Sequence, residues 1–566
     1  MQIVRRLYLY GMSGITLGVL LVGLNNLFVV VFHAFGLGRG ELIGGNAGDR
    51  EQLSLAIALT LVGLLVWTVH WLFVERSVRI DAVGSEGERG SAIRALYVSL
   101  VLAVLLLFGV LAGIQLLEAV ARALLGVSNS PDFGFLGIDA GAALATLLVV
   151  GLAWLYHAAI RRRDLATAPI EGAAAWIPRI YLYGATFVGL VLAALNIGTL
   201  LSTALDVAVG TRPDFVDPDF IRRGTADALA GIVGWGVVFV GHWWYATSLM
   251  RGKGWRASSD QRSRVRVAYL LAVIVAGAIA TIVFVAQAVS AVLRLQFGFQ
   301  DEFSSTTLQM VLGPLLSLLP WAFAWLLHRR WLEDEANMLA DPARSLAVSR
   351  LASAGVALIG VLAAAGGIGG LLGLLLDIVL GGNRTSEQLW RREVDEFLAV
   401  AFIGCVLWLW NWASLQARRS RDPEGEAHST IRRAYLLSVV GASLLAGLAS
   451  LIVLLYQLFN AILGVDPFVN RASEISASLG ALLTAIGLAV YHGRAERRDH
   501  ALRESTVVPE TPATAAETST QTGPIEATVQ VVERRLVLRG ASADEVEAAL
   551  RQLRSNLPAN IVLEED

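Results

Sequence analysis

Twelve long apolar stretches constrain the fold of this chain more than any other feature. Each is long enough to cross the hydrocarbon core of a bilayer, which takes about 20 apolar residues in a helix. Only 16% of the residues are charged, whereas a soluble domain carries roughly 25%. We therefore predict an all-α integral membrane protein with twelve transmembrane helices. The stretches cover approximately residues 7–35, 52–75, 95–125, 139–160, 180–209, 228–249, 267–297, 307–327, 351–380, 396–415, 434–463 and 475–492.

The stretches alternate between two types and predict six helical hairpins. The first of each pair has about 28–30 residues and the second nearer 22, and the second leads into arginines. Each second stretch ends in a repeated motif, usually Trp-x-x-His. Because five of the eight histidines share this position, we interpret the hairpin as an internal repeat. The position is held by His70, His157, His242, His328, His492 and, in the fifth copy, Asn411; the motif tryptophans are Trp67, Trp154, Trp325 and Trp408.

The first stretches also alternate, which indicates a larger unit. Odd copies begin with Arg6-x-Tyr8 or Arg179-x-Tyr181, and the third odd copy has Arg350 but Ala352 in place of the tyrosine. Even copies begin with an Arg-x-x-Tyr motif. Corresponding arginines lie about 170 residues apart, so we predict three tandem four-helix domains, at 1–166, 167–340 and 341–504. The even-copy motifs are Arg94 and Tyr97, Arg266 and Tyr269, and Arg432 and Tyr435.

The distribution of positive charge predicts the orientation. Loops after the second stretches hold 23 arginines and lysines, and loops after the first stretches hold 9. By the positive-inside rule, both termini are expected in the cytoplasm. Nearly all the positive charge is arginine, which is typical of a high-GC bacterium, so we expect a bacterial cytoplasmic (inner) membrane.

This orientation places the Trp-x-x-His motifs and the Arg–Tyr starts at the same membrane boundary, which tryptophan and tyrosine favour. Within a hairpin, the histidine should then lie within hydrogen-bonding reach of a tyrosine or arginine. We predict an interfacial repeat motif with a structural or sensing role. Alternatively, the two histidines of a domain bind haem or sense pH. The motif residues are His70, His157, His242, His328, His492, Asn411, Trp67, Trp154, Trp325, Trp408, Arg6, Tyr8, Arg94, Tyr97, Tyr181, Tyr269 and Tyr435.

A second polar register follows 25 residues after the first tyrosine position, about 37 Å along a helix. From it we predict an outer-side polar cluster of Asp206, Arg294, Asp377 and Arg122, in which Asp206 and Arg294 could pair. The alternatives are ordinary helix-end polarity and an outward vestibule. Between the two registers the midplane is almost empty of ionisable groups, which argues against proton-coupled transport. Small residues around Gly366–Gly373 predict close helix packing.

After the last stretch, the sequence predicts a flexible linker at 505–526 and a small cytoplasmic α/β tail at 527–566. Residues 529–538 and 560–563 favour strands, and Ser542-x-x-Glu545 is a capping box that opens a helix. We expect this β-α-β tail to self-associate or to bind a protein partner by strand addition.

The net charge of −2 predicts no nucleic-acid partner, and the single cysteine, Cys405, excludes a disulfide framework. Neither catalytic residues nor a metal site is predicted, and haem is the one cofactor kept as an alternative. The repeated motifs and tandem four-helix organisation resemble a family of uncharacterised bacterial multi-pass proteins built on a repeated domain of unknown function. The resemblance covers roughly residues 1–500 and implies no activity. We expect a non-enzymatic membrane scaffold or sensor; the alternatives are a channel or transporter for a small or apolar solute, and a haem-binding redox protein.

Overall fold

The computed structural model describes residues 2–35, 37, 47–80, 87–127, 140–165, 172–209, 218–251, 259–296, 307–338, 342–381, 389–463 and 468–506. The described part is all-helical, and twelve of its helices are long and apolar enough to cross a membrane. The protein is thus a multi-pass membrane protein. The predicted tail at 527–566 and nearly all of the linker lie outside the described residues.

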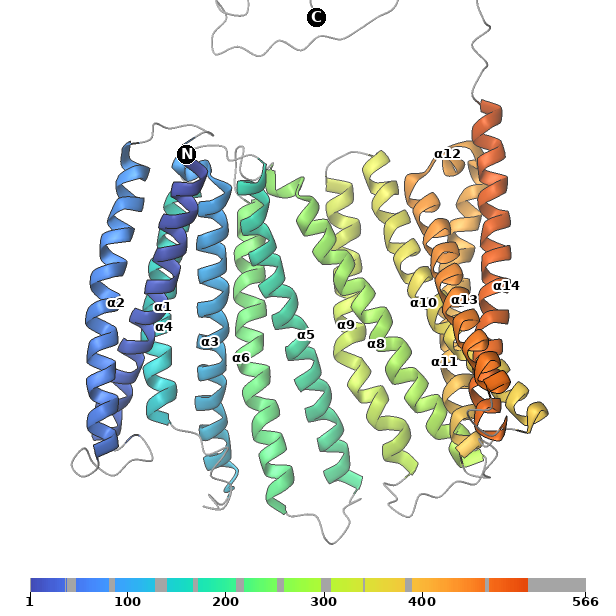
Figure 1. The fold of residues 1–566 in the computed structure, drawn as a ribbon, viewed down its shortest axis with the longest axis horizontal. Helices are drawn as coiled ribbons and strands as arrows, with labels where there is room; N and C mark the ends of the chain where they lie inside the picture. Colours follow the sequence, from blue (N-terminus) through green and yellow to red (C-terminus); the bar gives the residue numbers. More distant parts are fainter. Residues whose placement is uncertain are drawn as a thin grey trace, which may run out of the picture. The chain divides into compact units, whose positions relative to one another are not determined.

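The twelve helices pair into six hairpins in chain order (Figure 1). The first hairpin joins α1 (Gln2–Ala34) to α2 (Ala47–Ile80), and the second joins α3 (Ala92–Leu124) to α4 (Ala140–Leu165). The remaining pairs are α5 (Ala173–Val209) with α6 (Pro218–Arg251), α8 (Arg264–Gln296) with α9 (Thr307–Met338), α10 (Pro342–Leu380) with α11 (Leu389–Arg421), and α13 (Thr430–Leu463) with α14 (Phe468–Thr506). Two short elements, η1 (Glu88–Gly90) and α12 (Pro423–Ala427), lie in loops.

Consecutive hairpins all pack in the same way. The first helix of each hairpin contacts both helices of the next one: α1 contacts α3 and α4, α3 contacts α5 and α6, and the pattern continues to α10 with α13 and α14. The hairpins therefore stand side by side in a row. The N-terminus and the C-terminal end of α14 both lie along the upper edge of this row as drawn in Figure 1.

The second helices are much longer than their apolar stretches. All but α4, which has 26 residues, have between 32 and 39, as long as the first helices. They continue past the histidine because the arginine-rich segments that follow also contain good helix formers such as Ala, Leu and Glu. Residues one or two turns beyond each histidine consequently lie on the same helix as the motif.

Glycines set two close helix approaches of α10. A Cβ on Gly360 would lie 2.6 Å from the backbone nitrogen of Trp408 in α11, and one on Gly373 would lie 3.0 Å from Ala477 in α14. Gly367 and Gly370 also face α11 at positions where a side chain would overlap its atoms. The close packing predicted from this small-residue stripe is therefore present, and α10 uses it on two sides.

Candidate functional site

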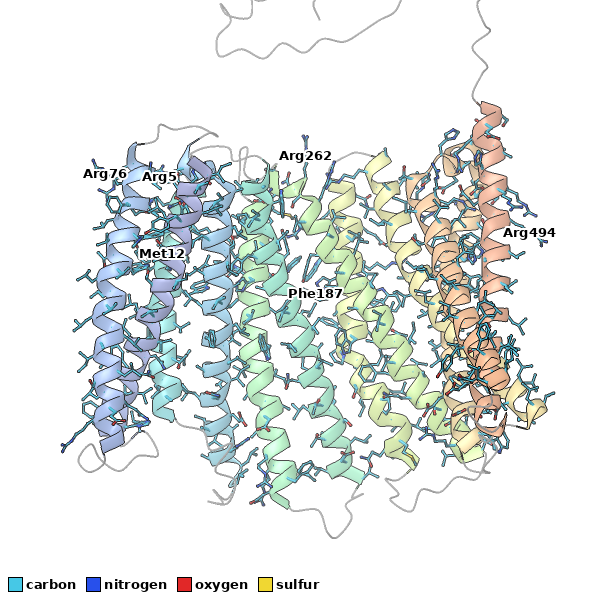
Figure 2. All side chains as sticks on the ribbon, viewed as in Figure 1. Arg5, Met12, Arg76, Phe187, Arg262 and Arg494 are labelled. Atoms are coloured by element: carbon cyan, nitrogen blue, oxygen red, sulfur yellow. The ribbon has the colours of Figure 1, made fainter. Side chains whose placement is uncertain are left out.

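The arginine-rich ends of the helices gather at one edge of the row. Figure 2 shows Arg5, Arg76 and Arg262 at this edge, while Met12, Phe187 and Arg494 lie further along their helices. Here the first helices begin and the second helices end. The repeated motifs therefore share one level, and the polar contacts described next all lie there.

One buried arginine in each even hairpin is the centre of this level. Arg94, Arg266 and Arg432 are each 1% exposed. The carboxylates that bind them come seven residues after the histidine of the same hairpin, which is two helical turns along one face. Through Nε, Arg94 binds Asp164 at 2.6 Å, Arg266 binds Glu335 at 2.8 Å and Arg432 binds Asp499 at 2.7 Å. We call these three pairs the arginine layer.

A tryptophan lies under each of these arginines. The guanidinium carbon of Arg266 is 4.6 Å from the ring centroid of Trp243, and the corresponding distances are 5.3 Å for Arg432 over Trp412 and 5.9 Å for Arg94 over Trp71. These tryptophans directly follow the histidine position of the odd hairpins. Cation–π contact thus explains why only odd copies carry a tryptophan there, because their second helices face the arginine of the even hairpin.

A second set of ion pairs joins the start of each odd hairpin to the segment just before the even hairpin that follows it. An acidic residue six positions before each central arginine binds the arginine that opens the odd hairpin. The pairs are Arg6 with Glu88 at 2.9 Å, Arg179 with Asp260 at 2.7 Å, and Arg350 with Glu426 at 2.7 Å. The arginine that opens each odd hairpin is therefore paired with a carboxylate, as the central arginine of each even hairpin is.

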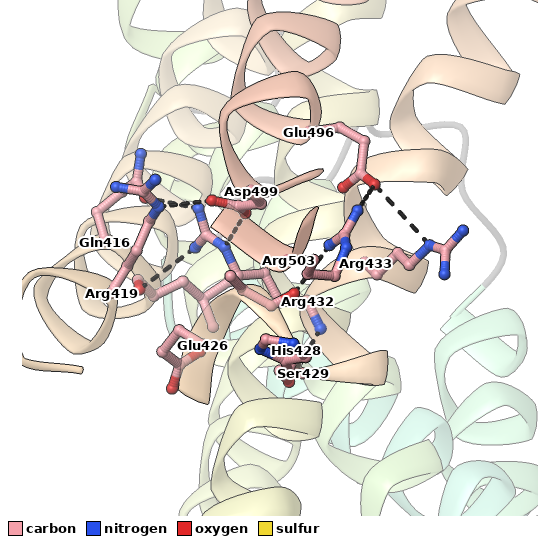
Figure 3. A network of polar contacts seen from close by, with 12 residues as sticks. Gln416, Arg419, Glu426, His428, Ser429, Arg432, Arg433, Glu496, Asp499 and Arg503 are labelled. Carbon is pink, nitrogen blue, oxygen red and sulfur yellow. Dashed lines mark hydrogen bonds and ion pairs between the residues drawn. The ribbon is translucent and has the colours of Figure 1, made fainter. Parts of the chain in front are cut away.

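The third repeat shows the network in most detail (Figure 3). Asp499 accepts hydrogen bonds from Arg432 and from Arg419, at 2.7 and 2.6 Å. One turn earlier on α14, Glu496 accepts a bond of 2.5 Å from Arg503 and lies 3.8 Å from Arg433. Helices α11, α13 and α14 are thus joined through carboxylates that are already occupied by arginines.

Histidine and tyrosine form a second layer next to the arginines. In four hairpins the tyrosine hydroxyl lies within hydrogen-bonding distance of histidine Nε2: Tyr8–His70 at 3.3 Å, Tyr181–His242 at 3.3 Å, Tyr269–His328 at 2.9 Å and Tyr435–His492 at 3.3 Å. We call these pairs the histidine layer. Each of these pairs has the hydrogen-bonding distance that we expected between the two motif positions.

The partners of the histidines fix their tautomer. In all five, Nδ1 lies 2.7–3.1 Å from the carbonyl oxygen four residues earlier. A carbonyl only accepts, so Nδ1 carries the proton, and in the four bonded pairs Nε2 is left to accept from the tyrosine. Asn411 reproduces half of this arrangement, because its Nδ2 donates to the Leu407 carbonyl at 2.9 Å. Where the tyrosine is absent, an asparagine amide is therefore sufficient to make the bond to the backbone carbonyl.

The pair of the second hairpin, Tyr97 with His157, is the exception. His157 Nε2, the Tyr97 hydroxyl and Trp67 Nε1 are all buried without a hydrogen-bond partner. The rings of Tyr97 and His157 still face one another, with centroids 6.1 Å apart. In the third repeat, the corresponding residues bond directly, since Trp408 Nε1 donates to the Tyr435 hydroxyl at 3.1 Å. The same residue types thus pack differently in the first repeat.

The motif tryptophans connect neighbouring hairpins. Trp154 of α4 donates to the Tyr181 hydroxyl of α5 at 3.3 Å, and Tyr181 in turn meets His242 of α6. Trp325 meets no tyrosine, because Ala352 occupies that position; it packs against Gly277 of α8 instead. The repeat motif therefore acts between hairpins as well as within them.

The four residues of the second polar register each bond the second helix of the next hairpin. Arg122 binds Asp227 of α6 at 3.0 Å, as well as Glu118 of its own helix. Arg294 pairs with Asp395 and Glu396 of α11, Asp206 accepts from Gln309 of α9, and Asp377 accepts from Ser476 of α14 at 3.1 Å. They are spread along the row at successive junctions.

Sequence reasoning missed the carboxylates of both ion-pair sets. Asp164, Glu335 and Asp499 share the seventh position after a histidine, and Glu88, Asp260 and Glu426 share the sixth position before an arginine. Aligning the repeats past the apolar stretches would have revealed both spacings. Chemically, the arrangement holds helices together: its carboxylates bind arginines, and most of its imidazole nitrogens are engaged. Among the described residues, no group of three or more His, Cys, Asp or Glu side chains could hold a metal ion.

Comparison with known families agrees with the repeat. The family model described as Domain of unknown function (DUF5671) matches residues 6–143, 137–237, 179–323 and 350–487, which together span most of the membrane region. Three of these matches begin at Arg6, Arg179 and Arg350, the arginines that open the odd hairpins. No curated protein and no solved structure matches the chain. The chain therefore belongs to the family defined by this domain of unknown function, which it carries in tandem copies.

Proposed function

We propose that the protein is a non-enzymatic membrane scaffold or sensor whose output is the tail at 527–566. The observation that carries the proposal is the arginine layer, in which three buried cations are each held by a carboxylate of the neighbouring helix. Charged groups that bind each other in this way hold a structure and are not free to bind a substrate. The repeat supplies three such clamps along one row.

The proposal includes the division into three four-helix domains at 1–166, 167–340 and 341–504. Two observations support it: the motifs alternate between odd and even hairpins, and each arginine of the arginine layer lies over a tryptophan of the preceding odd hairpin. The linker at 505–526 would give the β-α-β tail freedom to reach a protein partner or a second copy of the chain.

We further propose that the arginine-rich edge faces the cytoplasm of a bacterial cell, on the strength of the loop-charge asymmetry. A protease-accessible tag inserted after Gly126 tests this orientation. The tag should be cleaved from outside intact cells, and cleavage only after the membrane is permeabilised would reverse the assignment.

The output role is tested by removing residues 505–566. The truncated chain should insert and melt like the full chain, because the described interhelical contacts lie before this point, and it should lose proteins that crosslink to the full chain in cells. Misfolding of the truncation, or unchanged crosslinking, would contradict a separable output domain.

Two alternatives have direct tests. A channel or transporter would produce flux in proteoliposomes, whereas we expect none for ions or for a panel of small solutes. A haem protein would show a Soret band. We expect no band, because four of the five motif histidines have Nδ1 on a backbone carbonyl and Nε2 on a tyrosine, so haem would have to displace a bond at each ligand.

A further inference from the structure

A large apolar cavity lies at the junction of the second and third hairpins. It occupies about 720 Å³ between α3, α4, α5 and α6, within the roughly 300–1,000 Å³ typical of ligand sites. Leu105, Gly109 and Val150 form part of its wall. Leu155 and Val237, which also line it, are 59% and 68% exposed, so the cavity opens on the lipid-facing surface.

Two arginines that form no ion pair with a carboxylate of the described ranges border this cavity. Arg161 is half-buried, and its one hydrogen bond is a long contact of 3.5 Å to the Ser99 hydroxyl. Over the described ranges, no carboxylate lies within ion-pairing distance of Arg161 or Arg162. The next residue, Arg163, is bound by Glu75 at 2.6 Å. This contrast matters because a half-buried cation beside apolar surface is costly unless an anion accompanies it.

Aromatic side chains complete the polar end of the cavity. Tyr181 and His242 line it and are already bonded to each other, at 3.3 Å. The partly buried Tyr245 also lines it. The cavity therefore combines a long apolar wall with two arginines and a phenol at the end where the membrane boundary lies.

An internal control exists at the corresponding junction of the fourth and fifth hairpins. A cavity of about 480 Å³ lies there between α8, α9, α10 and α11. Four and five residues after the histidine, it has Leu332 and Glu333 where the first cavity has Arg161 and Arg162. Its lining arginine, Arg329, is paired with Glu333 at 3.1 Å. Two cavities at corresponding junctions of the row thus differ in the charge of the side chains at one end.

We propose that the cavity between α3 and α6 binds one anionic phospholipid of the surrounding bilayer. An acyl chain lies along the apolar wall, and the phosphate accepts hydrogen bonds from Arg161 and Arg162. Arginine suits this role because its planar guanidinium donates two parallel bonds to a phosphate. A zwitterionic lipid brings a compensating cation and gains less from the pair. The lipid site depends on neither the proposed scaffold role nor the tail, so a negative result for the site would leave those two proposals unaffected.

Native mass spectrometry of the full chain, titrated with phosphatidylglycerol and with phosphatidylcholine, tests the proposal. The wild type should retain one phosphatidylglycerol with at least tenfold preference over phosphatidylcholine. The double variant Arg161→Gln/Arg162→Gln should lose that preference, while the matched variant Arg329→Gln at the second cavity should keep it. Equal binding of the two lipids by the wild type, or equal loss in both variants, would overturn the site.

A second variant separates binding from folding. Gly151 lines the cavity, and an added Cβ there would meet no atom within 4 Å. Gly151→Leu should therefore fill the cavity, leave the melting temperature without added lipid unchanged and abolish retention of the lipid even though both arginines remain. Retention at the wild-type level would show that the arginines bind lipid without the cavity and would refute the proposal as stated.

Discussion

The arginine layer and the histidine layer lie side by side but have different tolerance for sequence change. The arginine–carboxylate pair is formed in all three even hairpins. The histidine layer is incomplete in two places: Asn411 and Ala352 replace its residues in the third repeat, and Tyr97 and His157 do not bond in the first. The difference is what electrostatics predicts, because an unpaired buried charge costs far more than an unpaired neutral group.

Arg266→Leu should have the largest effect on stability. It leaves Glu335 without the cation that binds it through two nitrogens, and losing one partner of a buried pair costs about 3–5 kcal/mol. Thermal unfolding in detergent measures the loss. The control is Arg264→Leu, which removes an exposed arginine two residues earlier and should have little effect. Equal effects in the two variants would remove the distinction between the layers.

The double variant Arg266→Leu/Glu335→Leu should be markedly more stable than Arg266→Leu alone. Replacing both members of a buried ion pair by apolar residues is often close to neutral, because no charge is left uncompensated. The same unfolding assay gives the result. If the double variant were as unstable as the single one, the pair would matter for its shape and hydrogen bonds to Tyr183, not for its charge balance.

Tyr269→Phe should cost less, about 1–3 kcal/mol, since it leaves the buried His328 Nε2 without its donor. Tyr8→Phe removes the corresponding hydroxyl from a tyrosine that is 58% exposed, where water replaces the lost partner. Its cost should lie within a few tenths of a kcal/mol of zero. A larger loss for Tyr8→Phe than for Tyr269→Phe would show that burial does not set the strength of this layer.

A modest gain in stability is expected from restoring the missing pair with Ala352→Tyr and Asn411→His. Both positions line the cavity of about 480 Å³, which offers room for the larger side chains. The change should stabilise the chain by about 0.5–1.5 kcal/mol, the net value of one hydrogen bond. Destabilisation by the double replacement would mean that the third repeat has repacked around the smaller residues.

Much of this architecture was accessible from the sequence because it depends on apolar length and on the spacing of motifs. The twelve helices, the hairpins and the meeting of Tyr8 with His70 follow from those two quantities. The carboxylates of the arginine layer were not predicted, since they lie in polar segments where helix continuation was not foreseen. The bonds of Asp206 and Arg294 depend on which hairpins are neighbours, and spacing along one helix carries no information about that.

The uniform stacking of hairpins also bears on how such a chain can change length. Each hairpin presents one side to its predecessor and a different side to its successor, so the row has two unlike ends. Inserting or deleting a pair of hairpins would rebuild one junction and leave the others untouched, as in proteins whose repeats contact only their neighbours. Duplication could therefore extend the molecule without a new interface having to evolve.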